Sequence, residues 1–437
     1  MIPLLIAMTL GAPGVDRASG PSLTGRQVLP KDTQIPYDVE NVYGQIIKTG
    51  ILIGTEFFVV RDAGRRLQVR NVGENGWIDR ARVMSPEEAV ASFSAEINAD
   101  PTSPAAYTRR AKAHELRQDW DAAIRDYDET VKLQPQTYSY LNNRANYRVR
   151  KRDYEGAAAD YDASLVLAPK APIPLGNRGG LYVTLREWDK AIEYYDRAIE
   201  ANPTYARGLA GRSNAWREKG DFAKSRADAE EACRLDGTIA HTWNARGLVR
   251  AALADYANAL ADFDTCLRFD PLFAAGYYNR AGVHLAMKNY QPAIRDLDTA
   301  IRILKANAMA YVRRSEAWAA CGNPFKAFED VAEAIGIDPA HGPAYRQKAW
   351  LLATSVDDRK RDGNAALEAA KKALALWKSP GGAFFESMAA ALAETGDLKG
   401  AVDWQTKAMS DAAHVRQNVE VLKKRLESYR AGKAWRE

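Results

Sequence analysis

The stretch AHTWNARGLVRAALADYANALADFDTCLRFDPLF, residues 240–273, decides the fold of this chain. In its first half, Trp243, Arg246 and Arg250 share one face of a helix, because they follow the three-to-four spacing of helical neighbours. In its second half, apolar residues recur at helical spacing until Pro271 ends the pattern. The stretch therefore predicts two helices joined by a short turn.

The same pattern recurs every 34 residues along the chain. Each arginine of the series is followed by a small residue one position later, and in most repeats by an aromatic residue ten positions later. We refer to these arginines as the arginine ladder: Arg110, Arg144, Arg178, Arg212, Arg246, Arg280 and Arg314. A fixed period of this length is typical of helical repeats, and such short helix pairs must stack to bury their apolar faces.

These columns resemble the tetratricopeptide repeat family, whose 34-residue unit has this pattern of aromatic, small and proline positions. The resemblance covers 104–341 as seven regular repeats, after a half repeat over 85–103. Two degenerate repeats follow over 342–412, with five extra residues within Ser355–Gly363. The resemblance implies a mainly α fold, a right-handed α-solenoid of stacked helix pairs, closed by a capping helix and tail over 413–437.

The repeat array as a whole is predicted to span 85–412 and has a well-marked start. Ser85 supplies a capping hydroxyl, Pro86 suits the first helical turn, and Glu88 stands where a capping box places its acid. These residues predict a helix that begins directly after Ser85.

The arginine ladder has two interpretations. An aspartate recurs sixteen positions after most of its members: Asp126, Asp160, Asp228, Asp262, Asp296 and Asp330. In the first interpretation, the ladder is a set of ion pairs that fixes the register of stacked repeats. In the second, it is a row of cationic docking points for an acidic ligand. We favour the structural ladder, because buried arginines need partners and the matching acids have the same period.

The family resemblance also indicates a binding surface. In this family the first helix of each repeat lines a concave groove, and positions 2, 5, 9, 12 and 13 usually point into it. Here these positions give Asn142, Asn146, Arg150, Gly176, Gly180, Arg207, Asn214, Arg217, His241 and Asn244. Amides pair with a peptide backbone, glycines leave room for close approach, and arginines hold carboxylates. The alternative is a merely solvated polar face, since an open groove must be polar anyway.

Residues 26–84 differ in kind from the repeats. Short β-rich runs such as Glu56–Arg61 are separated by glycine turns, and the last run contains Gly76, Trp77 and Ile78. This order predicts a small antiparallel barrel or meander and looks like a bacterial Src-homology-3-like barrel. The resemblance implies attachment to cell-wall peptides or to other proteins. We interpret Trp77 as a core residue rather than a ligand platform.

The first 25 residues contain a short apolar stretch, Ile2–Leu10, followed by small and turn-forming residues. Residues 1–25 are therefore predicted to be a signal peptide and linker, with cleavage near Ala12 or Ala18. The basic segment that normally precedes such a stretch is missing, so a cytoplasmic chain is the alternative to export to the periplasm or cell envelope. We expect no transmembrane segment, because no apolar run is long enough to span a bilayer.

The sequence contains no recognisable catalytic or metal-binding motif. The five histidines are scattered, and the three cysteines lie within repeat helices, where packed thiols are expected. No phosphate-binding loop, nucleophile elbow or dinucleotide fingerprint is present. We therefore expect no enzyme, no cofactor, no metal and no small-molecule substrate.

The function predicted from these patterns is that of a non-enzymatic scaffold or adaptor. It would bind peptide segments or partner proteins, of unknown identity, in the concave groove of the array. Two alternatives remain: a helical-repeat protein that binds RNA, and a cell-wall-associated protein that acts through the barrel. The net charge of only +5 argues against nucleic acid as the partner.

Overall fold

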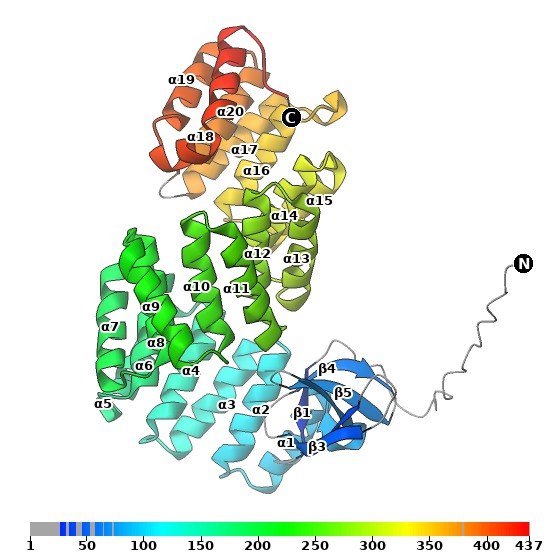
Figure 1. Cartoon of the computed structure of the whole chain (residues 1–437), viewed down its shortest axis with the longest axis vertical. Helices are drawn as coiled ribbons and strands as arrows, with labels where there is room; N and C mark the ends of the chain where they lie inside the picture. The colour runs from blue at the N-terminus through cyan, green and yellow to red at the C-terminus, as the bar shows by residue number, and fades with distance from the viewer. Residues whose placement is uncertain are drawn as a thin grey trace, which may run out of the picture. The chain divides into compact units, whose positions relative to one another are not determined.

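The computed structural model describes residues 27–31, 35–40, 46–52, 57–63, 65–71, 74–377 and 380–436. The chain divides into two compact parts, one ending at Thr238 and the other beginning at Ile239. We refer to them as the N-terminal part and the C-terminal part, and both are mainly helical (Figure 1). The signal peptide and linker predicted over 1–25 lie outside the described residues.

Among the described residues, the N-terminal part has seven short strands ahead of its helices. They are β1 (Gln27–Pro30), β2 (Ile35–Glu40), β3 (Ile46–Leu52), β4 (Phe57–Asp62), β5 (Arg66–Asn71), β6 (Glu74–Asp79) and β7 (Val83–Met84). Their order in the sheet is β3-β2-β6-β5-β4-β1-β7, and the described pairings are antiparallel. Val59, Leu67 and Ile78 belong to a buried cluster between them. The strands do not by themselves establish a closed barrel, so the Src-homology-3-like barrel predicted over 26–84 is not confirmed.

After the strands, the described residues of the N-terminal part form nine α-helices. They are α1 (Pro86–Ala99), α2 (Pro104–Leu116), α3 (Trp120–Leu133), α4 (Tyr138–Lys151), α5 (Tyr154–Leu167), α6 (Pro172–Thr184), α7 (Trp188–Ala201), α8 (Ala206–Lys219) and α9 (Phe222–Leu235). The predicted capping box starts α1, because the Glu88 backbone N–H donates to Ser85 Oγ and the Ser85 N–H donates to Glu88 Oε2. Phe93 of α1 packs with Leu29 and Met84, which joins the helices to the sheet.

The C-terminal part continues the alternation of first and second helices. Its helices are α10 (Ala240–Ala252), α11 (Tyr256–Phe269), α12 (Ala274–Ala286), α13 (Tyr290–Ile303), α14 (Ala308–Ala320), α15 (Pro324–Ile337), α16 (Gly342–Thr354), α17 (Gly363–Leu376), α18 (Gly382–Glu394), α19 (Leu398–Ala408) and α20 (Ala412–Arg430). A short 3-10 helix, η2 (Asp358–Lys360), lies between α16 and α17. It falls within the predicted insertion Ser355–Gly363, and α20 stands where the capping helix is expected.

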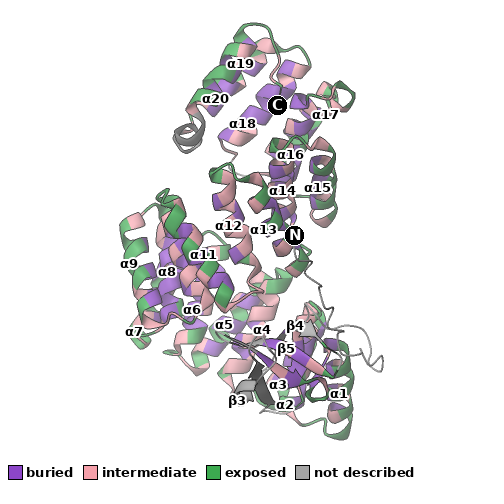
Figure 2. Cartoon of the chain, turned by 45° about the vertical axis from the view of Figure 1, so that its right-hand side comes forward, coloured by how far each residue is buried: buried purple, intermediate pink, exposed green. Residues whose placement is uncertain are grey.

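Small residues let the two helices of each repeat approach closely. A Cβ added at Gly247 of α10 would lie 2.9 to 3.1 Å from ring atoms of Phe263, a fully buried residue of α11. The alanine columns are buried in the same way, and buried residues lie along the facing sides of paired helices (Figure 2). The periodic small positions are therefore the places where a large aromatic ring of the second helix fits against the first helix.

The 34-residue period also appears in the backbone. The turn between the two helices of each regular repeat contains one residue with positive φ: Gln118, Arg152, Arg186, Gly220, Ala254, Lys288 and Gly322. Most of these residues are not glycine, although the left-handed region disfavours other side chains. The turn geometry is thus imposed by the packing of the helix pair rather than by local sequence preference.

Candidate functional site

Most arginines of the ladder extend from the first helix of a repeat to the second helix of the same repeat. Arg280 shows the geometry: its Nε and Nη2 donate to the two carboxylate oxygens of Asp296 at 2.8 and 2.6 Å. Arg110, Arg144, Arg212, Arg246 and Arg314 make the same bidentate contact with the aspartate sixteen positions later. The hydrogen bonds that Arg280 donates to Asp296 raise the pKa of its guanidinium further, so this arginine stays charged.

Several ladder arginines also hold the preceding repeat. Nη1 of Arg280 donates to Asp264 at 2.5 Å, and this aspartate lies on the second helix of the repeat before. The equivalent contacts are Arg144 with Asp128, Arg212 with Asp196, and Arg314 with Asp298. One guanidinium thus connects the second helices of two neighbouring repeats.

Arg178 departs from this scheme for a reason visible in the sequence. The residue sixteen positions after it is Tyr194 rather than an aspartate. Arg178 instead donates from Nε and Nη2 to Asp162 of the preceding repeat, at 3.0 and 3.1 Å. Its guanidinium also lies 4.6 Å from the ring centroid of Tyr182. Each ladder guanidinium therefore contacts at least one carboxylate of the chain, and an acidic ligand would have to compete with it.

The two glycines predicted to line the groove lie beside tyrosine side chains of the array. A Cβ at Gly176 would lie 2.9 Å from the ring of Tyr205, and Gly176 itself is buried. A Cβ at Gly180 would lie 3.5 Å from the hydroxyl of Tyr195. The space beside Gly176, which was predicted to admit a ligand, is therefore occupied by the side chain of Tyr205.

Three of the predicted groove asparagines make contacts within the array. Asn142 and Asn244 are each only 4% exposed. Each accepts a hydrogen bond from an asparagine of the next repeat, Asn177 at 2.9 Å and Asn279 at 2.8 Å. Asn146 Oδ1 accepts from the hydroxyl of Tyr161 at 2.6 Å. These amides therefore connect helices, and burial removes Asn142 and Asn244 from an open peptide-binding face.

The remaining predicted groove residues are more accessible but do not converge. Arg150 and Arg207 are exposed, and Arg217 pairs with the neighbouring Glu218. Asn214 has a buried Oδ1 without a hydrogen-bond partner among the described residues. The ring of His241 lies edge-on to Phe273, with the two centroids 6.3 Å apart. None of these residues lines the pocket found in the C-terminal part.

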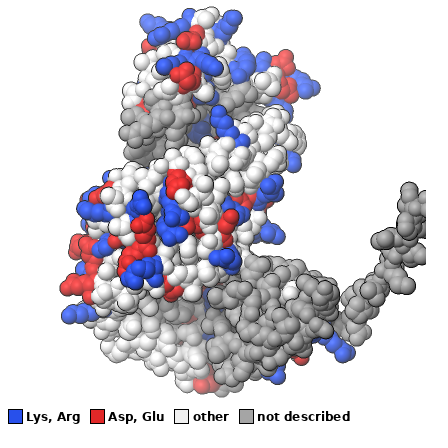
Figure 3. All heavy atoms as spheres, in the orientation of Figure 1, with Lys and Arg blue, Asp and Glu red and all other residues white. Residues whose placement is uncertain are grey.

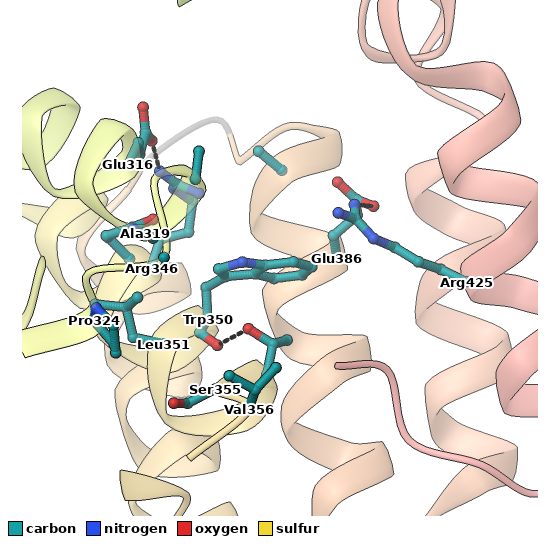
Figure 4. A pocket seen from close by; sticks show the side chains of 15 residues that line it. Glu316, Ala319, Pro324, Arg346, Trp350, Leu351, Ser355, Val356, Glu386 and Arg425 are labelled. Atoms are coloured by element: carbon teal, nitrogen blue, oxygen red, sulfur yellow. Dashed lines mark hydrogen bonds and ion pairs between the residues drawn. The ribbon is translucent and has the colours of Figure 1, made fainter. Parts of the chain in front are cut away.

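That pocket has a volume of about 420 Å³ and lies on the first helices of consecutive repeats (Figure 4). Its lining comes from α14, α16 and α18, from the start of the second helix α15 and the turn before it, from the capping helix α20, and from the loop that follows α16. We refer to it as the α14–α20 pocket. First helices are the ones that the family resemblance implies as the binding face.

Two ion pairs stand at the α14–α20 pocket. Arg346 of α16 pairs with Glu316 of α14, and Arg425 of α20 pairs with Glu386 of α18. Arg425 and Glu386 are both buried, with side chains 9% and 8% exposed. Trp350 lies between the pairs, and the Arg425 guanidinium is 4.5 Å from the centroid of its ring. Each arginine is thus held in place by a glutamate of another helix.

The loop after α16 forms another wall. Ser355 ends α16 with a ψ of 134°, which turns the chain out of the helix, and Val356 follows with 71% of its surface exposed. Leu351 and Pro324 add apolar surface beside Val356 (Figure 4). Ser355 is 4% exposed, and its hydroxyl has no hydrogen-bond partner among the described residues. The insertion that interrupts the repeat pattern therefore contributes directly to the pocket.

The pocket residues were not among those predicted from the sequence, although the same rule points to most of them. Glu316 and Trp350 stand at position 9 of their repeats, and Arg346 and Glu386 stand at position 5. They belong to the seventh, eighth and ninth repeats, whereas the predicted groove residues lie in the second to fifth repeats. Arg425 lies in the capping helix, which has no repeat position, so only the structure could place it in the pocket.

The thiols and histidines of the described residues do not form a reactive cluster. Burial raises the pKa of Cys266 to about 12, which keeps this thiol protonated, and Cys233 is buried as well. Cys321, predicted to be a packed thiol, is instead exposed, because it stands at the end of α14. Among the described residues no group of three or more metal-ligating side chains is found. No described helix is both long and apolar enough to cross a membrane.

The sequence matches a known family over part of its length. One model of the tetratricopeptide repeat matches residues 108–172, and another matches residues 173–205, so the chain carries tetratricopeptide repeats in this region. No curated protein matches the chain.

Solved structures of tetratricopeptide repeat proteins are similar to this chain at low sequence identity. One from Parabacteroides merdae is 18% identical, with 54% of this chain and 93% of that chain covered and a TM-score of 0.41. A thermophilic one from Thermus thermophilus is 19% identical, with 42% and 99% covered and a TM-score of 0.39. YrrB, described as having an unusual peptide-binding site, is 20% identical, with 44% and 98% covered and a TM-score of 0.31.

Proposed function

We infer from the tetratricopeptide repeats that this chain is a non-enzymatic scaffold that holds a partner protein on its first helices. Tetratricopeptide repeat proteins are generally scaffolds for protein interactions. The observation that carries the proposal for this chain is the α14–α20 pocket, which opens on the helices that the repeat pattern assigns to the binding face. A concave site with an aromatic wall and a few fixed polar groups is what a bound segment of a partner requires.

The charge arrangement supports a protein partner over RNA. Nucleic-acid binding depends on cations that are available to phosphates. Both arginines of the pocket instead pair with glutamates, Arg346 with Glu316 and Arg425 with Glu386. On the face shown in Figure 3, basic and acidic side chains over the central helices are interspersed rather than gathered by sign. This pattern suits a peptide surface of mixed polarity.

The experiment is affinity capture with the whole chain as bait, followed by identification of both proteins and RNA. Arg346→Ala removes a pocket arginine whose side chain is 14% exposed. Its matched control is Arg234→Ala, an ion-paired arginine that is 69% exposed on the second helix α9. We expect the first variant to lose captured proteins with unchanged helicity by circular dichroism, and the control to keep them. Recovery of RNA alone, or equal capture by both variants, would contradict the proposal.

A further inference from the structure

We propose that the α14–α20 pocket takes one bulky apolar side chain, such as leucine, from an uncharged peptide segment of the partner. This assignment rests on the proposed function and specifies the chemistry of the segment. Two features of the pocket carry it: the cancellation of charge at its walls, and the apolar surface contributed by the insertion after α16.

The first feature is the balance of charge. Arg346 and Arg425 are each neutralised by a glutamate of a neighbouring helix, Glu316 and Glu386. A charged side chain that entered this space would lose its water and would have no unmatched charge to meet it. An apolar side chain has no such cost, because its burial is favourable by itself.

The second feature is the apolar surface beside these pairs. Trp350, Leu351, Pro324 and Val356 all line the pocket. Val356 is 71% exposed, so its aliphatic side chain is accessible to an apolar group that enters the pocket. A cavity of about 420 Å³ accommodates one large side chain together with its adjoining backbone.

The pocket also has polar groups suited to a peptide backbone. Gln347 is 2% exposed and Ser355 is 4% exposed, and both line the cavity. Buried amide and hydroxyl groups are the usual partners of backbone N–H and C=O groups in peptide sites. Ser355 and Val356 come from the insertion, so the irregular eighth repeat is what distinguishes this position from the regular repeats.

The test uses three peptides that differ in one residue: acetyl-Gly-Ser-Leu-Ser-Gly-amide and its versions with Asp or Lys in place of Leu. Binding is followed by NMR on the indole N–H signal of Trp350 in the full chain, assigned with Trp350→Phe. We expect a saturable shift with the leucine peptide and at least tenfold weaker binding of the two charged peptides. Equal binding of all three peptides would overturn the assignment.

Val356→Asp tests the role of the insertion. We expect it to weaken binding of the leucine peptide at least tenfold. The control Val166→Asp, at an 80% exposed valine of α5, should leave that binding unchanged. Circular dichroism checks the fold, and Val356→Asn, which adds no charge, should weaken binding to a smaller extent. If Arg346→Ala abolishes protein capture but the leucine peptide gives no saturable shift, the scaffold function stands and the apolar side-chain assignment fails.

Discussion

Arg425 of the capping helix lies with its guanidinium 4.5 Å from the ring centroid of Trp350, on the first helix of the eighth repeat. The same guanidinium pairs with Glu386 of α18 and lies 5.6 Å from the centroid of Trp435 in the C-terminal tail. An open stack of repeats needs a cap to cover its last apolar face. Here the cap also completes the wall of the pocket, so the same arginine belongs to the cap and to the proposed binding site.

Arg425→Met is expected to destabilise this end of the chain strongly. It removes the arginine that pairs with the buried Glu386, and removing one member of a buried ion pair costs about 3–5 kcal/mol. Urea unfolding, followed by hydrogen exchange in α18 and α20, measures the loss. The double variant Glu386→Gln with Arg425→Met should recover a large part of it, because no uncompensated charge remains. A single variant as stable as the parent chain would refute the role of this pair.

Arg280→Met tests the arginine ladder. Its guanidinium bridges Asp296 and Asp264, so the change leaves the largely buried Asp296 without its cation, at a cost of about 3 kcal/mol. The control is Arg226→Met, whose exposed pair with Glu230 is worth about 0.5 kcal/mol or less. Thermal unfolding by circular dichroism compares the two. Loss of protein capture by Arg280→Met at an unchanged melting temperature would instead favour the ladder as a row of docking points.

Substitution by alanine is expected to have opposite effects on stability at two glycines of the C-terminal part. Gly247→Ala places a Cβ 2.9 Å from the buried ring of Phe263 and should destabilise by about 1–3 kcal/mol, because the ring has little room to move. Gly336→Ala meets no atom within 4 Å and should stabilise α15 by up to about 1 kcal/mol. Urea midpoints of the two variants check this. The same sign for both would show that the close approach at Gly247 does not matter.

The folded chain is expected to lose stability in mild acid because of His284. Partial burial lowers its pKa below the usual 6.5, and its Nδ1 is buried without a hydrogen-bond partner among the described residues. Below pH 6.5 the unfolded chain takes up a proton that the folded ring resists, so stability present at pH 7.5 is lost as the pH falls. The melting temperature should therefore drop between pH 7.5 and 5.5, and His284→Gln should reduce this drop. A variant with the same drop as the parent would exclude His284 as its cause.

Much of the fold could be predicted from the sequence because the same local packing and ion pairing recur in most of the regular repeats. The 34-residue step places the two helices, the small residue beside the aromatic ring, and the arginine with its aspartate sixteen positions later. The ladder was predicted to fix the register of stacked repeats, but the partner in the preceding repeat, as Asp264 is for Arg280, was not named, because it depends on how two repeats stack. Asp264 nevertheless has the same period as the ladder, so the signal was present in the sequence.

The candidate site was harder to predict for two physical reasons. Groove positions in the N-terminal part carry small residues and amides, and neighbouring side chains fill the space there, as Tyr205 does at Gly176. The pocket forms where the repeat becomes irregular, at Ser355 and Val356, and where the capping helix contributes Arg425. A periodic pattern assigns no positions to insertions or caps, so it could not predict how they combine.

The most direct test of the scaffold function is site-specific photo-crosslinking in the pocket. A photoreactive amino acid is placed at Val356, at the mouth of the α14–α20 pocket, and in a separate chain at Val166 of α5, which is similarly exposed. Both chains are irradiated with proteins captured by the parent chain, and the adducts are identified by mass spectrometry. The proposed function predicts a discrete protein adduct at Val356 and none at Val166. Adducts of equal yield at both positions, or none at Val356, would contradict it.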